Sequence, residues 1–284
     1  MIVTDYTGVR YEALDDGTIA RITMSRPEVR NAQDRRMLAE LNDAFTRASL
    51  DDKVRVIILA GDGPHFSSGH DLKDHLAWAE NPDDVTGGFA VRPVGIEGGF
   101  SLPGAEGYLA YEQEIYFRMC RRWHDLPKPT IAQVHGKAIA GGLMVMWVCD
   151  LIVASEDALF SDPTVGFGVN GVEWFSHPWE LGVRKAKELL FTGDFITAEE
   201  ARQLGMVNQV VAPADLEAYT EDLARRIARK PSFALRLAKM AVNQALDAQG
   251  FWTAQQAAFN LQHLGHADIR EAAERAAGVD ETEH

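Results

Sequence analysis

Cysteine and positive charge are both scarce in this chain of 284 residues. The two cysteines, Cys120 and Cys149, have apolar surroundings and the spacing of neither a disulfide framework nor a zinc site, so we expect a reducing, cytoplasmic compartment. Lysine and arginine number 28 against 42 acidic residues, which gives a net charge of −14. This excess of negative charge argues against nucleic-acid or anionic-membrane binding as the main activity.

Several familiar sequence patterns are missing as well. No apolar run is long enough to cross a membrane, and no signal peptide or lipidation motif is found, so we expect no membrane partner. A GxSxG elbow, a P-loop and a GxGxxG after a strand are absent, which disfavours the enzyme classes built on them. His65, His70 and His75 are five residues apart and cannot align on one helix face, so we expect no metal site.

We expect the chain to be organised around residues 128–163, where glycines separate a strand from a helix. Thr130–Val134 reads as a buried strand, His135-Gly136 ends it, and Gly141-Gly142 opens an apolar helix over Leu143–Cys149. The first N–H groups of a helix have no partner within the helix and carry positive potential, so Gly141 could stabilise an oxyanion. Close packing of helix on strand is the alternative reason for these glycines.

A second stretch repeats this strand, glycine and helix order. Val54–Ala60 is a β-branched run typical of a central strand, and a turn containing Gly69 follows it before a helix expected from Asp71. One N–H group after Gly69 and another at Gly141 could therefore hold one thioester oxygen from two sides.

Four strings carry a family resemblance in the same order: ITMSRPEVRNAQ, VRVIILAGDGPHFSSGHDLK, KPTIAQVHGKAIAGGLMVMWVCDLIVASEDALFSDP and LLFTGDFITAEEARQLGMVNQVV. They resemble the enoyl-CoA hydratase/isomerase (crotonase) superfamily over about residues 22–211. The resemblance implies an oxyanion hole made by the backbone N–H groups of His70 and Gly141. It also implies an acyl-CoA substrate, with coenzyme A as part of the substrate and no permanently bound cofactor.

The alternation of strands and helices favours an α/β fold. The resemblance specifies a crotonase-like spiral of ββα units at residues 1–212 and a helical region for trimerisation at 213–284, which implies a homotrimer or a dimer of trimers. Asn81–Gly107, rich in glycine and proline, is expected to be a long loop. The resemblance implies that this loop lines the acyl pocket. Among the other elements, we expect a hairpin within Val9–Met24 and a strand at 206–211. Helices are expected at 32–50, 108–124 and 172–190, and a capping box at Thr197–Glu200 precedes a helix that Gly205 ends. From Ala214 onward we expect helices with breaks near Pro231 and Gly250.

The catalytic acids mark a departure from the family. Its hydratases use two glutamates, at the positions of Met144 and Thr164 here, and neither side chain can transfer protons at neutral pH. Some members place a carboxylate near Val172, next to Glu173, and we expect apolar neighbours to raise the pKa of Glu173. A helix-start carboxylate is the structural alternative for Glu173. Asp162 is a second candidate, with a turn before Pro163 as its structural alternative.

These substitutions leave the reaction open. Isomerisation needs only one acid/base group, for which Glu173 would suffice, whereas hydrolysis of a thioester or a β-diketone would need Asp162 or His70 to activate water. A chain without both glutamates could also be a non-catalytic acyl-CoA-binding scaffold, but a scaffold needs no oxyanion hole. The resemblance places the CoA-binding path at Arg26, Arg30, Ser68, His70, Lys73 and Gly141, while the acidic C-terminal segment offers few cations for the CoA phosphates.

Overall fold

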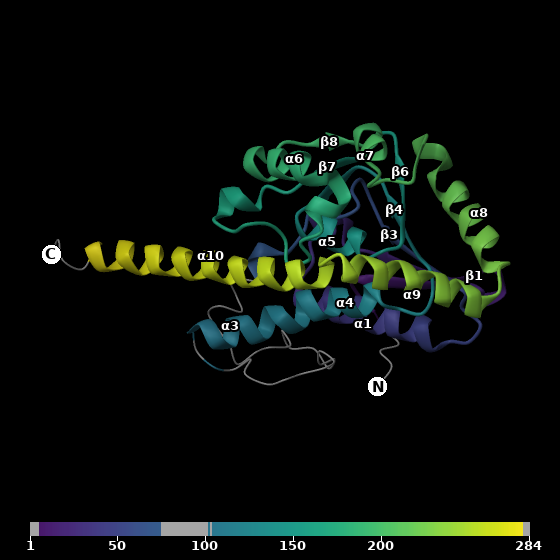
Figure 1. The fold of residues 1–284 in the computed structure, drawn as a ribbon, viewed down its shortest axis with the longest axis horizontal. Coiled ribbons are helices and arrows are strands. Elements are labelled where there is room, and N and C mark those ends of the chain that lie inside the picture. Colours follow the sequence, from purple (N-terminus) through teal and green to yellow (C-terminus); the bar gives the residue numbers. More distant parts are fainter. Residues whose placement is uncertain (1–5, 75–101, 103, 281–284) are drawn as a thin grey trace.

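The computed structural model describes residues 6–74, 102 and 104–280 (Figure 1). The expected loop at 81–107 and the helix expected from Asp71 lie largely outside these residues, although Leu72, Lys73 and Asp74 are helical. Among the described helices, none combines the length and the apolar character that a membrane span requires.

A six-stranded sheet forms the centre of the molecule, with strands in the order β1-β2-β3-β4-β6-β9. The first two strands are antiparallel and all later neighbours are parallel. Parallel strands are buried on both faces and read as β-branched runs, which is why these strands were visible in the sequence. Their bounds are Val9–Leu14 (β1), Ile19–Met24 (β2), Val56–Gly61 (β3), Thr130–Val134 (β4), Leu151–Ser155 (β6) and Gln209–Val211 (β9).

The hairpin expected within Val9–Met24 is confirmed, and its turn residues Asp15, Asp16 and Gly17 all have positive φ. A second sheet of three short strands, in the order β5-β7-β8, was not expected from the sequence. These strands are too short to show a period: Lys137–Ile139 (β5), Leu159–Ser161 (β7) and Ile196–Thr197 (β8). The second sheet brings the segment before Gly141 next to the segment before Asp162, because β5 and β7 are parallel neighbours.

Helices cover both faces of the central sheet. On one face α1 (Arg35–Leu50) begins at Asp34, whose side chain accepts a hydrogen bond from the N–H of Met37. The expected helix at 108–124 is one helical stretch made of α3 (Gly104–Glu112), a π-helical segment (Gln113–Arg118) and α4 (Met119–His124). The central helix α5 (Gly141–Trp147) lies two residues earlier than expected and is completely buried. On the other face α8 (Leu216–Ala228) packs against β3 and β4 (Figure 1).

The helix expected at 172–190 starts later than predicted. The observed helix α6 spans His177–Thr192, and residues 172–176 form an irregular buried segment in front of it. Pro178 accounts for a helix start here, because proline is favoured in the first turn of a helix. The next helix, α7 (Ala198–Leu204), has the expected cap, with Thr197 accepting from the N–H of Glu200 and Gly205 at its end.

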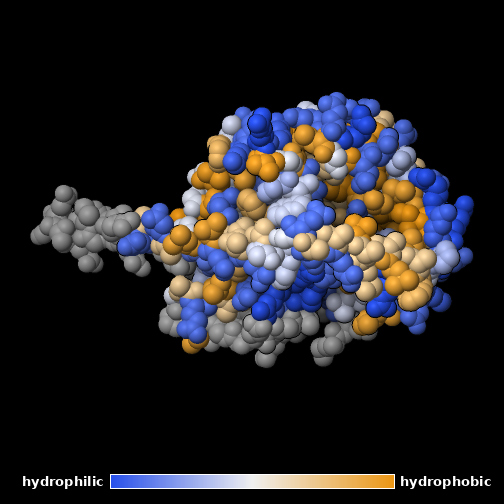
Figure 2. Space-filling view, in the orientation of Figure 1, coloured by the Kyte–Doolittle hydropathy of each residue, from blue (hydrophilic) through white to orange (hydrophobic). Residues whose placement is uncertain are grey.

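Two long helices follow α8 and are interrupted where Pro231 and Gly250 predicted. They are α9 (Ser232–Ala248) and α10 (Phe251–Asp280), and α10 extends well beyond the rest of the protein (Figure 1). Phe251 and Phe259 of α10 are buried, whereas α9 has no buried side chain. Exposed apolar side chains gather on this face of the molecule (Figure 2); on α9 and α10 they are Phe233, Leu237, Met240, Val242, Leu261, Leu264 and Ile269.

Candidate active site

Gly69 and Gly141 bring two distant chain segments into contact. Gly69 has a φ of +93°, and a Cβ atom there would lie 2.8 Å from the carbonyl oxygen of Ile139 and 3.1 Å from the nitrogen of Gly141. Only glycine permits both this backbone conformation and this approach. The loop that holds His70 is therefore pressed against the start of α5, as the two half-sites in the sequence predicted.

The backbone N–H groups of His70 and Gly141 lie next to this contact. The carbonyl of Gly69 and the N–H of Asp71 are both bonded to Gln33, which fixes the peptide groups on either side of His70. The side chain of Gln33 also donates to the carbonyl of Gly141 at 3.0 Å. Within the described part of the chain, the N–H groups of His70 and Gly141 have no hydrogen-bond acceptor. Two donors are thus held near one another by a shared partner, Gln33.

The side chain of His70 lies over the start of α5. A Cβ atom on Gly141 would be 2.8 Å from Cε1 and 2.9 Å from Nδ1 of His70, so the ring occupies the space that this glycine leaves. The ring of Tyr116 stacks on the other side, with the two centroids 4.1 Å apart. Tyr116 belongs to the π-helical segment, and such segments frequently occur at functional sites. Tyr116 is also buried in the main hydrophobic core.

Glu173 holds the other edge of the His70 ring. Its Oε2 lies 2.9 Å from Nε2 of His70, and its Oε1 accepts a hydrogen bond of 2.9 Å from the side chain of Gln262 on α10. The Glu173 side chain is only 5% exposed. Glu173 therefore lies in the buried segment before α6. The structural alternative, a carboxylate in the first turn of a helix, is not what the structure shows. Gln262 was not identified from the sequence, because nothing local marks a glutamine in a long helix as a partner of Glu173.

The electrostatics of this pair differ from the expectation. Burial by itself raises the pKa of Glu173, but the charge of His70 and its hydrogen bond outweigh burial and lower that pKa from 4.5 to about 2. Burial also opposes a charged His70, yet Glu173 outweighs it and raises the pKa of His70. The predicted rise in the pKa of Glu173 was wrong because the sequence could not show the histidine beside it. Nδ1 of His70 is buried and accepts or donates no hydrogen bond within the described chain.

Asp162 lies in a second buried pair. Its Oδ2 is 2.7 Å from Nε2 of His177 and 3.2 Å from the N–H of Val172, and its Oδ1 accepts from the hydroxyl of Thr164 at 2.6 Å. Burial raises the pKa of Asp162, but the bonds from His177 and Thr164 prevail and lower it. The bond to Val172 N–H ties Asp162 to the segment that carries Glu173.

The former glutamate positions are filled by side chains that cannot transfer protons. Met144 is fully buried within α5, and Thr164 donates its hydroxyl to Asp162. Neither side chain can serve as a general acid or base at neutral pH.

The residues expected along a CoA path differ in their surroundings. The guanidinium of Arg26 is bound by Asp34 at 2.8 Å, by Asp71 at 3.2 Å and by the carbonyl of Ala32 at 2.7 Å. Arg30 and Lys73 are exposed, and the carbonyl of Arg30 accepts from the N–H of Ser68. Of these three cations, Arg30 and Lys73 are the exposed ones; Arg30 precedes His70 in the sequence and Lys73 follows it.

Comparisons with known proteins agree with this architecture. The family described as enoyl-CoA hydratase/isomerase matches residues 15–89 and 106–279. A Mycobacterium tuberculosis protein provisionally named an enoyl-CoA hydratase is 48% identical over 265 residues, which cover 93% of this chain and 82% of the relative. The short-chain-enoyl-CoA hydratase of Clostridium acetobutylicum is 30% identical over 237 residues, 82% of this chain and 80% of that one.

Solved structures give the same result. A provisionally assigned enoyl-CoA hydratase from Mycobacterium smegmatis superimposes with a TM-score of 0.83 at 45% identity and covers 94% of this chain and 97% of its own. An enoyl-CoA hydratase/isomerase from Xanthobacter autotrophicus has a TM-score of 0.78 at 34% identity, with 93% of this chain and 88% of that chain covered. The expected α/β fold is confirmed.

Proposed function

Because this chain belongs to the enoyl-CoA hydratase/isomerase family and is an enzyme of that type, we propose that it transfers a proton at the carbon next to an acyl-CoA thioester. The proposed reaction passes through an enolate whose oxygen is held by the N–H groups of His70 and Gly141. Such preorganised donors stabilise developing negative charge, and each is worth roughly 100- to 1000-fold in rate. The observation that carries the proposal is the position of the His70 ring, which lies beside these donors with Nδ1 unbonded.

In this proposal the acid/base group is His70, and Glu173 positions it. When His70 is neutral with its proton on Nε2, this N–H group donates a hydrogen bond to Glu173, which leaves the lone pair of Nδ1 able to accept a proton from substrate. When Nδ1 holds that proton, Glu173 stabilises the imidazolium, and the proton can return to another carbon of the enolate. One group that accepts and returns a proton is sufficient for isomerisation. The glutamates missing at Met144 and Thr164 are then not needed.

Hydrolysis of a thioester or a β-diketone is a second candidate function, and one observation favours it. A histidine oriented by a buried carboxylate next to an oxyanion hole is also the arrangement of a general base that activates water. The same Nδ1 of His70 would accept the proton from water in that case. Asp162 does not fill this role in our proposal, because both its oxygens already accept hydrogen bonds. Oδ1 accepts from Thr164, and Oδ2 is bonded to Val172 and His177.

For the CoA moiety we propose contacts with Arg30 and Lys73, near Ser68. Phosphate groups require cations, and these two side chains are exposed, whereas Arg26 is bound by two aspartates. Coenzyme A enters as part of the substrate.

We further propose that the subunits assemble as a homotrimer or a dimer of trimers through the helical region at 213–284. The exposed apolar side chains of α9 support this, since Phe233 is 70% and Val242 67% exposed in the single chain. Sedimentation velocity tests the assembly, and a monomer at micromolar concentration contradicts it.

The function is tested by combining binding with turnover. Calorimetry measures the binding of acetyl-CoA and crotonyl-CoA, the absorbance of the crotonyl group follows hydration or isomerisation, and free thiol reports hydrolysis. We expect both thioesters to bind to the wild type and one of the two readouts, crotonyl absorbance or free thiol, to show turnover. His70→Gln should bind the thioesters but show no turnover. Thioester binding without turnover of any acyl-CoA tested points to a non-catalytic acyl-CoA-binding protein. Absence of binding contradicts the CoA assignment.

A further inference from the structure

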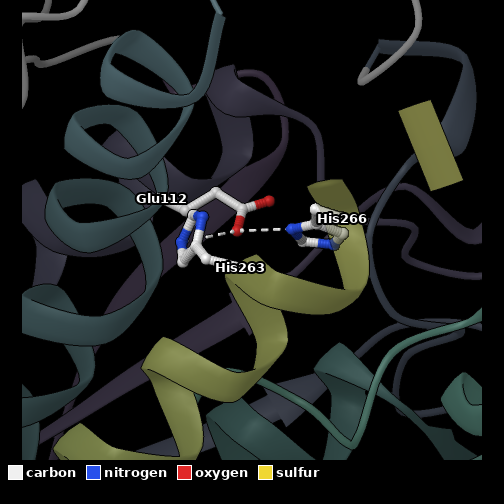
Figure 3. Close-up of side chains that lie close together, drawn as sticks. All are labelled: Glu112, His263 and His266. Atoms are coloured by element: carbon white, nitrogen blue, oxygen red, sulfur yellow. Dashed lines mark ion pairs between the residues drawn. The ribbon is translucent and has the colours of Figure 1, made fainter. Parts of the chain in front are cut away.

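A second cluster of chemically active side chains lies between α3 and α10. Glu112, the last residue of α3, points toward His263 and His266 on α10 (Figure 3). Nε2 of His263 and Nδ1 of His266 each lie 3.4 Å from the same oxygen, Oε2 of Glu112. The Glu112 side chain is 2% exposed, and the two histidines are 13% and 16% exposed. Three potential metal ligands, all within 4.8 Å of one another, thus converge from two helices.

The distances from the two histidines to Glu112 match metal coordination. A tetrahedral ion with bonds of roughly 2.0–2.1 Å to nitrogen and oxygen has ligands about 3.3–3.4 Å apart. Both distances to Oε2 have this value. They are longer than the charge-assisted hydrogen bonds of about 2.7–2.9 Å that a histidine and a carboxylate usually form. The histidines are three residues apart on one helix, a spacing that places two side chains on the same face.

We propose that Glu112, His263 and His266 bind one divalent first-row transition metal ion, of which Zn²⁺ is the representative. Two imidazole nitrogens and one carboxylate oxygen suit Zn²⁺ and its neighbours, whereas Mg²⁺ and Ca²⁺ prefer an all-oxygen set. A divalent cation also compensates the buried charge of Glu112, which lies in a protein interior where an isolated carboxylate is costly. Three protein ligands leave one coordination position for water.

The bound ion would join α10 to α3 directly beside the candidate active site. Gln262, which donates to Glu173, immediately precedes His263 on α10. The ring of Tyr108 on α3 packs edge-on against both histidines, with centroids 5.9 and 5.0 Å apart. A metal that fixes this part of α10 therefore also fixes the partner of Glu173. The metal site itself does not depend on the proposed reaction.

Metal binding can be measured directly on the tag-free full chain after treatment with a chelator and dialysis. Competition with a chromophoric zinc indicator gives affinity and stoichiometry, and Mg²⁺ serves as the ion that should not compete. We expect one Zn²⁺ per chain, and we expect Glu112→Gln and His266→Gln each to weaken binding by at least about 10- to 100-fold, since even outer-shell changes have that effect. His135→Gln, which removes a histidine bonded to the carbonyl of Gly63, should bind zinc like the wild type.

Thermal unfolding supplies an independent measurement. Zinc at about 100 times its dissociation constant for the wild type should raise the melting temperature of the wild type by roughly 5 °C and that of Glu112→Gln by about half as much or less. If either variant melts far below the metal-free wild type, His263→Gln replaces it in the comparison. The proposal is overturned if the wild type binds no zinc, if the variants bind it as tightly as the wild type, or if Mg²⁺ competes on equal terms.

Discussion

Two buried histidine–carboxylate pairs use the carboxylates just before and just after the segment 163–172, and our proposal gives the two pairs different roles. His70 and Glu173 are 2.9 Å apart, and His177 and Asp162 are 2.7 Å apart. The second pair is fully buried, whereas the side chain of His70 retains 17% exposure. The chemical groups are nearly the same, so the difference in their roles must come from what surrounds them.

The neighbours of the two rings supply that difference. The ring of His177 lies among aromatic side chains, with the centroids of Trp147 and Phe175 at 4.8 and 4.6 Å, and its side chain has no exposed surface. The ring of His70 lies instead beside the free N–H groups of its own residue and of Gly141. A pair that keeps some exposure beside backbone N–H donors is placed to act on a ligand, whereas a fully enclosed pair is placed to stabilise the fold.

The largest expected effect separates the two histidines. His70→Gln should lower kcat by roughly 100- to 10,000-fold, the usual contribution of a general acid/base, because the backbone donors remain but the proton acceptor is lost. Steady-state kinetics with the best acyl-CoA substrate measures this. The matched variant His177→Gln should lose stability while its folded fraction keeps most of its kcat. Equal losses of kcat in both variants would remove the distinction between the pairs.

Asp162 provides the stability counterpart. Asp162→Ala leaves His177 and the N–H of Val172 without their acceptor, so we expect a loss of about 3–5 kcal/mol in the free energy of unfolding. Urea unfolding measures it, and Asp194→Ala, at an exposed position, is the control that should change little.

The stability from Asp162 should also depend on pH. The pKa of Asp162 in the folded protein is lower than the ordinary 3.8. The ionised carboxylate therefore contributes its full stabilisation above pH 3.8, and this stabilisation is lost as the pH falls from 3.8 through the pKa of the folded protein. Asp162→Ala should therefore flatten the acid side of the stability profile. A profile with an unchanged slope would show that this pair does not stabilise the fold through its charge.

Gly141→Ala tests the place where the reactive pair meets the donors. The new Cβ would lie 2.8 Å from Cε1 of His70 and must displace the ring, so we expect kcat to fall by roughly 100- to 1000-fold. Gly166→Ala is the matched control, since a Cβ there meets no atom within 4 Å. If Gly141→Ala retains full activity, the His70 ring does not act from this position.

Glu173→Gln should produce the smallest but most diagnostic change. The charge of Glu173 raises the pKa of His70 against the effect of burial, so its removal should lower that pKa. A base is active when deprotonated, and the acid limb of the kcat profile should therefore move to lower pH in the variant. If Glu173 were itself the base, its pKa of about 2 would leave the wild type with no acid limb near neutrality. The pH profile thus identifies which member of the pair accepts the proton.

Much of the fold was predictable from local sequence. The strand runs at Val54–Ala60 and Thr130–Val134, the capping box at Thr197 and the breaks at Pro231 and Gly250 were all identified, because each depends on a few neighbouring residues. The start of α6 and the short strands β5, β7 and β8 were not, because their backbone is fixed by pairing between segments far apart in the chain.

The sequence by itself indicated the family, the α/β fold and the two glycine-bearing half-sites, and it placed Met144 and Thr164 where the resemblance led us to expect glutamates. Only the tertiary structure decided that Glu173 faces His70 and Gln262, and that this contact lowers rather than raises its pKa. Only the tertiary structure likewise brought Glu112 to His263 and His266. The physical reason is that a side chain's charge state depends on its neighbours in space, and those neighbours here lie about a hundred residues away or more along the chain.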